Sequence, residues 1–259
     1  MLLPRLIPCL LLRGQGLVKT TRFADPKYIG DPLNAVRIFN EKEVDELLFL
    51  DIEATSAGRE PNYELLSVLA RECRMPLCYG GGIRSPEVVE RLIGLGIEKV
   101  AIGSAVVERP NLIEEAAKRV GSQSIVGVVD VKRSRILRRQ EVVFRSATRS
   151  TAMHPATYAR QLRDAGVGEL LVQSVDNDGV GAGYDLELVD SVRSAVDIPV
   201  TALGGVGDFE HFAALVRRFG SIGAGAGSFF VLRGKYRAVL ISYPSRDERK
   251  ALAHASNQP

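Results

Sequence analysis

The stretch IVGVVDVKR, Ile125–Arg133, decides the fold class and lies near the middle of the 259-residue chain. Its Val, Ile and Gly positions run without interruption into Asp130, and Lys132 follows closely. A short apolar run of this kind is typical of a strand buried on both faces, as in a parallel sheet covered by helices. A carboxylate at the C-terminal end of such a strand is where barrel enzymes keep their chemistry. The alternative is that Asp130 simply ends the strand and caps a turn.

Short apolar runs alternate with amphipathic segments along the rest of the chain. The other expected strands cover 5–11, 46–51, 76–79, 99–102, 169–174, 199–203 and 222–226. The expected helices cover 32–45, 61–73, 85–95, 111–120, 155–165, 186–196 and 208–219. Eight strands alternating with helices, within the length of one domain, predict a single (βα)8 TIM barrel over residues 1–259. An open doubly wound sheet is the alternative.

Three polar segments interrupt this alternation. The loop that contains Lys19 and Gly30 is long for a connection between a strand and a helix, which favours a functional lid. The stretch Ser134–Ser150 contains the alternating sequence EVVFRS, which predicts a hairpin within a loop. The polar C-terminal tail, residues 247–259, is expected to fray.

The second half of the chain repeats the first. Glu46 and Glu169 each begin a Glu-Leu-Leu sequence, and they are 123 positions apart. Pro76 and Pro199 each precede a glycine pair and are again 123 positions apart. This period predicts two half-barrels, about 1–123 and 124–240, and an open sheet would leave it unexplained.

Small residues follow equivalent strands in the two halves. Glycine lets backbone N–H groups approach a ligand closely, and the start of the next helix carries partial positive charge toward an anion. We therefore expect two phosphate-binding cradles on opposite sides of the barrel, and a ligand with two phosphates or one long phosphorylated ligand. Plain turn chemistry is the alternative. The expected phosphate-binding residues are Gly81, Gly82, Gly103 and Ser104 in the first cradle, and Gly204, Gly205, Gly227 and Ser228 in the second.

Composition excludes several classes of function. The formal charge is +3, with 46% hydrophobic and 25% charged residues, and basic residues are not interleaved with aromatic ones as nucleic-acid binding requires. No apolar run approaches the roughly 20 residues of a membrane span, and the apolar N-terminus is too broken by prolines and arginine for a signal peptide. Cys9, Cys73 and Cys78 have no metal-ligand spacing, so we expect a reduced, cytoplasmic protein without metal or cofactor.

The sequence resembles the cyclase subunit of imidazole glycerol phosphate synthase from Arg5 to about Leu232. The matching motifs are RLIPCL (5–10), VK (18–19), GDP (30–32), DELLFLDI (45–52), YGGGI (79–83), GSQSIVGVVD (121–130), GELLVQSVDNDG (168–179), GYD (183–185), GGVGDFEHF (204–212) and AGSFF (226–230). The resemblance implies that ammonia from a partner glutaminase enters the bottom of the barrel and crosses its core. At the top, a phosphorylated substrate would be cleaved and cyclised.

The same resemblance implies an ammonia gate at the N-terminal ends of the strands. Arg5, Glu46, Lys99 and Glu169 occupy the matching positions, and each begins a strand. Two acids and two bases could close the entrance with salt bridges. The alternative is that these charges face solvent or pair locally.

The match to the family fails at one of the two catalytic positions. The family cyclises with two aspartates, one at the end of the first strand and one at the end of the fifth. The fifth strand supplies Asp130, but Leu11 occupies the partner position on the first strand. Leucine cannot transfer a proton, and a general acid or base contributes about 10²- to 10⁴-fold to a rate. If cyclisation occurs, the resemblance leaves Asp130, with help from Asp178 and Lys19, to perform it.

Resemblance to a paralogous branch of the family accounts for the leucine at position 11. The segments IPCLLL (7–12), FADPKYIGDPLNAVRIFNEKEVDEL (23–47) and RAVLISYP (237–244) resemble a branch associated with acetamidino modification of surface-polysaccharide sugars. In that branch the barrel pairs with a glutaminase-like subunit and supplies ammonia to a separate amidotransferase. We therefore expect an ammonia-conducting barrel with an incomplete cyclase. The alternatives are a histidine-pathway cyclase and a structural scaffold for the glutaminase.

Overall fold

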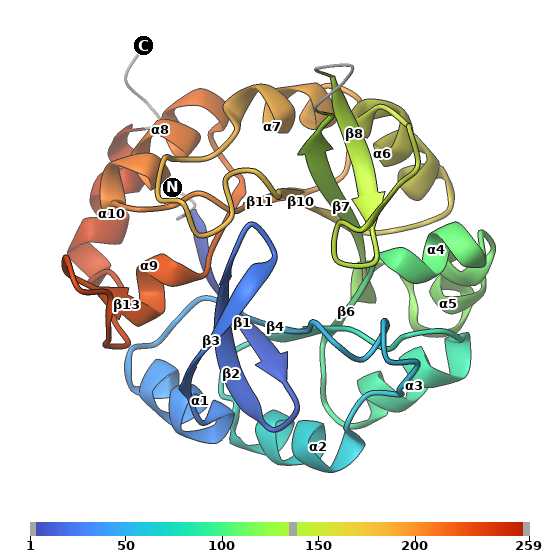
Figure 1. Cartoon of the computed structure of the whole chain (residues 1–259), viewed down its shortest axis with the longest axis horizontal. Helices are drawn as coiled ribbons and strands as arrows, with labels where there is room; N and C mark the ends of the chain where they lie inside the picture. Colours follow the sequence, from blue (N-terminus) through green and yellow to red (C-terminus); the bar gives the residue numbers. More distant parts are fainter. Residues whose placement is uncertain (1–3, 135–138, 256–259) are drawn as a thin grey trace.

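The computed structural model describes residues 4–134 and 139–255, and within them eight parallel strands close into a barrel (Figure 1). The sheet closes because β7 pairs with β10 and β12 pairs with β1. This closure confirms the TIM barrel and excludes the open sheet. In order around the barrel the strands are β1 (Arg5–Arg13), β4 (Leu47–Asp51), β5 (Leu77–Gly80), β6 (Lys99–Ile102), β7 (Ile125–Arg133), β10 (Glu169–Ser174), β11 (Val200–Leu203) and β12 (Gly223–Ala226).

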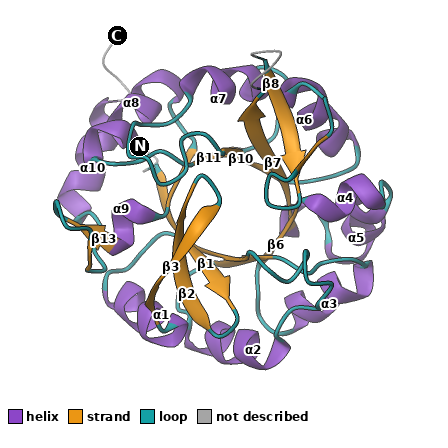
Figure 2. Cartoon of the chain, viewed as in Figure 1, coloured by secondary structure: helices purple, strands orange, loops and turns teal. Residues whose placement is uncertain are grey.

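Helices form a layer around the outside of the strands (Figure 2). Each barrel strand alternates, so one set of side chains packs against this layer and the other set fills the lumen. In β5, for example, Leu77 and Tyr79 belong to the outer core, whereas Cys78 belongs to the inner one. The helices are α1 (Pro32–Glu41), α2 (Tyr63–Glu72), α3 (Pro86–Gly94), α4 (Ser104–Glu108), α5 (Leu112–Val120), α6 (Pro155–Asp164), α7 (Leu186–Arg193), α8 (Phe209–Phe219), α9 (Ser228–Val231) and α10 (Arg246–Ala255), with a 3-10 turn at Ser122–Ser124.

The segment expected to be a loop after β1 is a β-hairpin. It consists of β2 (Gly16–Thr21) and β3 (Ala24–Gly30), and β2 pairs antiparallel with the end of β1. Leu17 and Val18 are buried by this pairing, so the hairpin is anchored to the barrel. The expected lid therefore has a regular core, and its tip reaches over the open end of the barrel (Figure 1).

The polar stretch after β7 contains the predicted hairpin. Strand β8 (Gln140–Phe144) pairs antiparallel with β7 and with the short β9 (Arg149–Ser150). The tight turn between β8 and β9 has positive φ at Arg145, Ser146 and Ala147. The rest of the predicted segment, residues 135–138, lies outside the described residues.

The C-terminal tail is ordered where we expected it to fray. A short hairpin of β13 (Leu232–Arg233) and β14 (Ala238–Val239) leads to α10, where we expected a frayed segment. Arg249 and Leu252 are buried, so long-range contacts hold this helix in place. The final residues, 256–259, lie outside the described part. Among the described helices, none has the length and hydropathy needed to cross a membrane.

Candidate functional site

The four charged residues expected at the gate form a closed ring of ion pairs at the N-terminal end of the barrel. Arg5 binds Glu46 at 2.9 Å and Glu169 at 2.6 Å. Lys99 binds Glu46 at 3.0 Å and Glu169 at 2.9 Å. Each charge therefore contacts both members of the opposite sign, and the entrance to the lumen is closed by side chains.

The alternating charges of the ring favour the ionised forms of Glu169 and Lys99 in spite of burial. Burial disfavours ionisation of Glu169, but hydrogen bonds and charge from Arg5, together with Lys99, hold the pKa of Glu169 below its ordinary value. Burial likewise works against Lys99, whereas Glu169 and Glu46 raise the pKa of Lys99. The Thr201 hydroxyl donates to Glu169 at 2.6 Å and supports the same state.

An apolar lumen lies directly above the ring. A cavity of about 10 Å³ adjoins the ring, which is the space that one molecule of the size of water needs. Its remaining walls are Ile7, Leu48, Cys78, Val126, Leu171 and Thr201. Closer to the mouth, the inner core continues through Cys9, Leu11, Leu50, Ala101, Val128 and Leu203. The lumen between the ring and the mouth is therefore mostly apolar, with Thr201 and Gln173 as polar residues along it.

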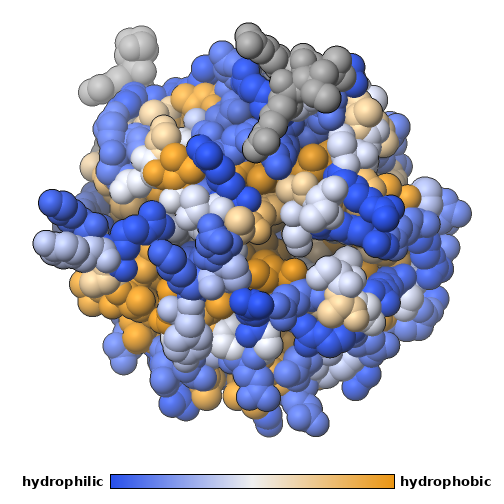
Figure 3. Space-filling view, viewed as in Figure 1, coloured by the Kyte–Doolittle hydropathy of each residue, from blue (hydrophilic) through white to orange (hydrophobic). Residues whose placement is uncertain are grey.

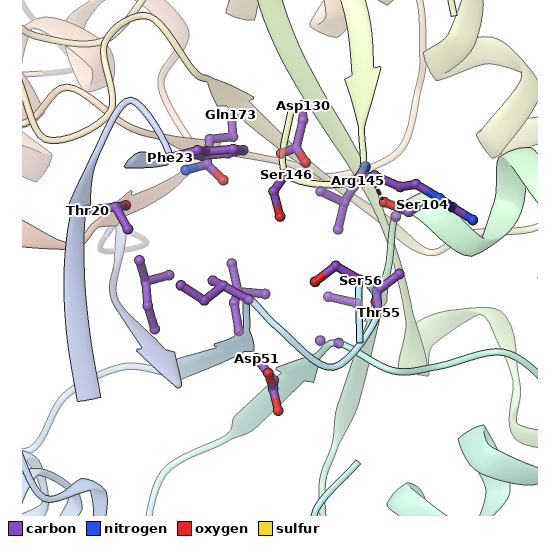
Figure 4. A pocket seen from close by; sticks show the side chains of 18 residues that line it. Thr20, Phe23, Asp51, Thr55, Ser56, Ser104, Asp130, Arg145, Ser146 and Gln173 are labelled. Atoms are coloured by element: carbon purple, nitrogen blue, oxygen red, sulfur yellow. Dashed lines mark hydrogen bonds between the residues drawn. The ribbon is translucent and has the colours of Figure 1, made fainter. Parts of the chain in front are cut away.

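The mouth contains a cavity of about 240 Å³ at the C-terminal ends of β4 to β7. The space-filling view shows apolar surface in the middle of this face, surrounded by polar side chains (Figure 3). Asp130 points into the cavity from β7, and Asp51 lies on the opposite side (Figure 4). Hydroxyl groups of Thr20, Thr55, Ser56, Ser104 and Ser146 line it as well. The cavity thus offers hydrogen bonds around an apolar floor.

Asp130 is the chemically distinctive group in this cavity. Its Oδ1 is shielded from solvent and has no hydrogen-bond partner among the described residues. Burial, with a further contribution from the charge of Asp178, raises the pKa of Asp130 to about 7. A carboxyl group with this pKa can accept or donate a proton near neutrality, or accept a hydrogen bond from a ligand. Leu11 lines the same cavity and offers no second group for proton transfer.

Asp178 is bound to the β2–β3 hairpin. Its Oδ2 accepts hydrogen bonds from the Thr20 hydroxyl at 3.0 Å and from the Phe23 amide at 3.3 Å. Its backbone carbonyl accepts from the Arg22 amide at 2.9 Å. Asp178 therefore holds the tip of the hairpin against the barrel. It does not line the cavity of Asp130.

Lys19 is buried on the other side of the mouth. Its Nζ donates to the Cys9 carbonyl at 2.5 Å, and burial lowers the pKa of Lys19. A second cavity of about 20 Å³ is lined by Lys19, Asp178, Gly204, Gly205, Gly227 and Ser228. The three expected catalytic residues are therefore divided between two cavities, which share Leu11 and Gln173 as walls.

The two expected phosphate cradles differ in the size of the cavity beside them. In the first, Gly81, Gly103 and Ser104 line the large cavity, while the Gly82 amide donates to the Thr55 hydroxyl at 3.1 Å. Gly81 has φ of +120°, and a Cβ there would lie 2.5 Å from the Asp51 carbonyl oxygen, so only glycine fits. The first cradle thus opens onto free space.

The second cradle opens onto the small cavity of about 20 Å³, and two basic side chains of the chain lie at it. The Nζ of Lys19 lies 2.5 Å from the point that a Cβ on Gly227 would occupy. Arg237 donates to the Ser228 hydroxyl at 3.3 Å and to the Gly179 carbonyl at 3.2 Å. An anion at this position would lie next to these two cations, in less free space than in the first cradle. Phosphate binding at either cradle stays a prediction.

Several residues of the mouth were not identified from the sequence. Arg145, in the β8–β9 turn, lines the large cavity, donates its amide to the Ser104 hydroxyl at 2.9 Å and binds Glu108 (Figure 4). Asp51 Oδ1 accepts from the amides of Glu53 and Ala54. The alternation of EVVFRS indicated the strand before Arg145, but nothing in the sequence indicated where its turn would lie. Within the described residues, no group of three His, Cys, Asp or Glu side chains is arranged to hold a metal ion.

Comparison with known proteins identifies the family. A model described as histidine biosynthesis protein matches residues 5–237. A protein of Leptospira borgpetersenii, provisionally named imidazole glycerol phosphate synthase subunit HisF, is 47% identical over 252 residues, which are 97% of this chain and 99% of that protein. A Pseudomonas aeruginosa protein, provisionally named as the second such HisF subunit, is 49% identical over 240 residues, with 93% and 95% coverage.

A third relative carries the same name without qualification. The imidazole glycerol phosphate synthase subunit HisF of Frankia casuarinae is 40% identical over 214 residues, which are 82% of this chain and 84% of that protein. The barrel, the sequence motifs and these matches cover nearly the same part of the chain. The chain therefore belongs to the histidine biosynthesis protein family and is a HisF-like member of it.

Proposed function

We propose that this chain is a barrel subunit that conducts ammonia from a partner glutaminase to a phosphorylated acceptor, in acetamidino-sugar biosynthesis for a surface polysaccharide. In this proposal it lacks a complete cyclase acid/base pair. One observation carries the proposal: a closed ring of four charges lies beneath an apolar lumen, and at the mouth Leu11 stands where the acid/base partner of Asp130 is expected.

Conduction of ammonia follows from the chemistry of the lumen. Ammonia is neutral and small, whereas ammonium is charged and would lose its hydration among Ile7, Leu48 and Val126. The ring separates this apolar space from bulk water. Ammonia released below the ring would pass when the ring opens, and above it would be kept from the solvent. The glutaminase would bind over the ring as the second subunit of a heterodimer. Neither nucleic acid nor a membrane takes part.

The mouth supports binding and delivery better than cyclisation. Cyclisation as the family performs it needs an acid and a base on opposite sides of the forming ring. Here Asp130 supplies one titrating group, and Asp51, on the opposite side of the cavity, uses its Oδ1 to accept from two backbone amides. Lys19 and Asp178 are engaged in contacts on the other side of Leu11. Asp130 would orient a ligand, and a separate amidotransferase could then use the ammonia on its own sugar substrate.

A histidine-pathway cyclase is the second candidate, and a specific observation favours it. The Frankia casuarinae relative is named as a subunit of imidazole glycerol phosphate synthase. In that case, the chain would convert a phosphoribulosyl aminoimidazole carboxamide ribotide and ammonia to imidazole glycerol phosphate. Asp130 would be its proton-transfer group, with Lys19 and Asp178 assisting after rearrangement of the hairpin.

Complementation of a cyclase-deficient histidine auxotroph distinguishes the two candidates. We expect no growth without histidine when the native chain is expressed, because one of two proton-transfer groups is missing. The Leu11→Asp variant should restore some growth, since a general acid or base contributes about 10²- to 10⁴-fold. Leu11→Asn, which has a similar shape but cannot exchange a proton, is the matched control. Robust growth with the native chain would refute the incomplete-cyclase proposal.

A further inference from the structure

A hydrogen-bonded cluster joins the C-terminal segment to the starts of β1 and β4, beside the ring. Its centre is Tyr243, in the RAVLISYP segment that lies outside the cyclase core match. The Tyr243 hydroxyl lies 2.8 Å from the Leu6 carbonyl oxygen and 2.8 Å from Asp45 Oδ2, and either can accept its proton. The Asp45 amide donates to the same hydroxyl at 3.2 Å. One tyrosine therefore binds the backbone of β1 and of the segment that enters the neighbouring strand β4.

Asp45 completes the cluster. Its Oδ2 accepts from the Leu6 amide at 3.0 Å, and its Oδ1 binds buried Arg249 of α10 at 2.5 Å. The Arg249 guanidinium lies 5.3 Å from the centre of the Tyr243 ring, and Phe230 stacks on the same ring at 5.4 Å. These contacts hold Tyr243 in one orientation, so the cluster is rigid on the side of the C-terminal segment.

Two residues of the cluster are sequence neighbours of two members of the ring. Leu6 follows Arg5, and Asp45 precedes Glu46, so the clamped backbone carries the Arg5–Glu46 ion pair. We propose that Tyr243, Asp45 and Arg249 are positioning residues for the gate, and that loosening of the C-terminal segment opens its Arg5–Glu46 side. This inference rests on the proposed role of the ring as an ammonia gate.

A purely structural role for Tyr243 can be separated from this one. Tyr184 is also buried, and its hydroxyl donates to the Gly225 carbonyl of β12 at 2.9 Å. Its loss should weaken the fold in a similar way without touching Leu6 or Asp45. Tyr184→Phe is therefore the matched control for Tyr243→Phe.

Cys78 reports on the gate in the full chain without any partner. It lines the small cavity against the ring, whereas Cys9 lines the cavity on the mouth side. The chain is treated with methyl methanethiosulfonate, and modification of each cysteine is followed in time by peptide-resolved mass spectrometry. Lys99→Ala, which removes a member of the ring, shows how fast Cys78 reacts when the gate is open.

We expect Tyr243→Phe to accelerate modification of Cys78 by roughly tenfold, because about 1.4 kcal/mol of hydrogen bonding no longer opposes opening. Cys9 should change much less, Tyr184→Phe should leave Cys78 slow, and Asp45→Asn should behave like Tyr243→Phe. If Lys99→Ala accelerates Cys78 but Tyr243→Phe does not, or if Tyr184→Phe accelerates it equally, the positioning role is overturned. If Lys99→Ala leaves Cys78 slow, the ring itself is not the barrier and the gate proposal fails with it.

Discussion

At the scale of single residues, Asp130 lies in an environment that disfavours its charge. Its shielded Oδ1 has no hydrogen-bond donor within the described part of the chain, and burial raises the pKa of the carboxyl to about 7. An aspartate in the unfolded chain titrates near pKa 3.9. The folded state therefore binds the proton more tightly than the unfolded state. Ionisation of Asp130 costs stability, and this cost appears as pH rises from about 4 to about 7.

Asp130→Asn should remove this pH-dependent cost. Relative to the native chain, the variant should gain unfolding free energy with rising pH, by at most about 1.4 kcal/mol per pH unit between pH 4 and 7, and the gain should level off above pH 7. The measurement is urea unfolding of both chains at several pH values. A difference between the two chains that stays constant across this range would show that the pKa of Asp130 is not raised.

At the scale of elements, the β2–β3 hairpin depends on one carboxylate from the far side of the barrel. Asp178 accepts from the Thr20 hydroxyl and the Phe23 amide, next to positive φ values at Arg22 and Phe23. A tip with strained backbone keeps one conformation only if its surroundings hold it there. Asp178 thus acts first as an anchor for the hairpin that carries Lys19.

Asp178→Ala should loosen the hairpin tip while the barrel stays folded. Loss of two hydrogen bonds to a charged group should raise the population of the open tip about tenfold or more, and trypsin should then cleave faster after Arg22. Limited proteolysis with mass spectrometry measures the rate at this bond. Asp178→Asn keeps an acceptor and should lie between the native chain and the alanine variant. An unchanged cleavage rate after Arg22 in Asp178→Ala would contradict the anchoring role.

Short-range sequence patterns predicted the elements that are fixed by contacts between residues close in sequence. The helix expected from residue 208 begins with Asp208 as its N-cap: the Asp208 side chain accepts from the His211 amide, and His211 Nδ1 accepts from the Asp208 amide. The tail was misjudged because its helix is polar by composition, with burial of Arg249 and Leu252 arising only from distant partners. The β2–β3 hairpin was missed for the same reason, because its strands are fixed by pairing with the end of β1.

At the scale of the whole molecule, the internal repeat predicted the barrel but not its asymmetry. The 123-residue period places β5 and β6 opposite β11 and β12, and equivalent glycines end these strands. Yet Lys19 and Arg237 lie at the second cradle and leave it a cavity of about 20 Å³, while the first opens onto a cavity of about 240 Å³. A repeat indicates which positions correspond. It carries no information on which side chains from other elements will enter each site.

The four ring residues, in contrast, could be placed together from sequence. Arg5, Lys99 and Glu169 each begin a strand, and Glu46 directly precedes one. Strands that begin at one end of a closed barrel bring the side chains there to one ring. Their ion pairs follow from alternating charge. What the sequence could not indicate is the cluster behind them, because Tyr243 and Asp45 are 198 positions apart.

The central claim is that this barrel supplies ammonia for a sugar modification and is not needed to make histidine. The most direct measurement is deletion of its gene in the native organism, followed by growth without histidine and NMR analysis of the surface polysaccharide. We predict histidine-independent growth and loss of the acetamidino groups, restored by the native chain and by Asp178→Asn but reduced with Lys99→Ala. Histidine auxotrophy with an unchanged polysaccharide would contradict the account.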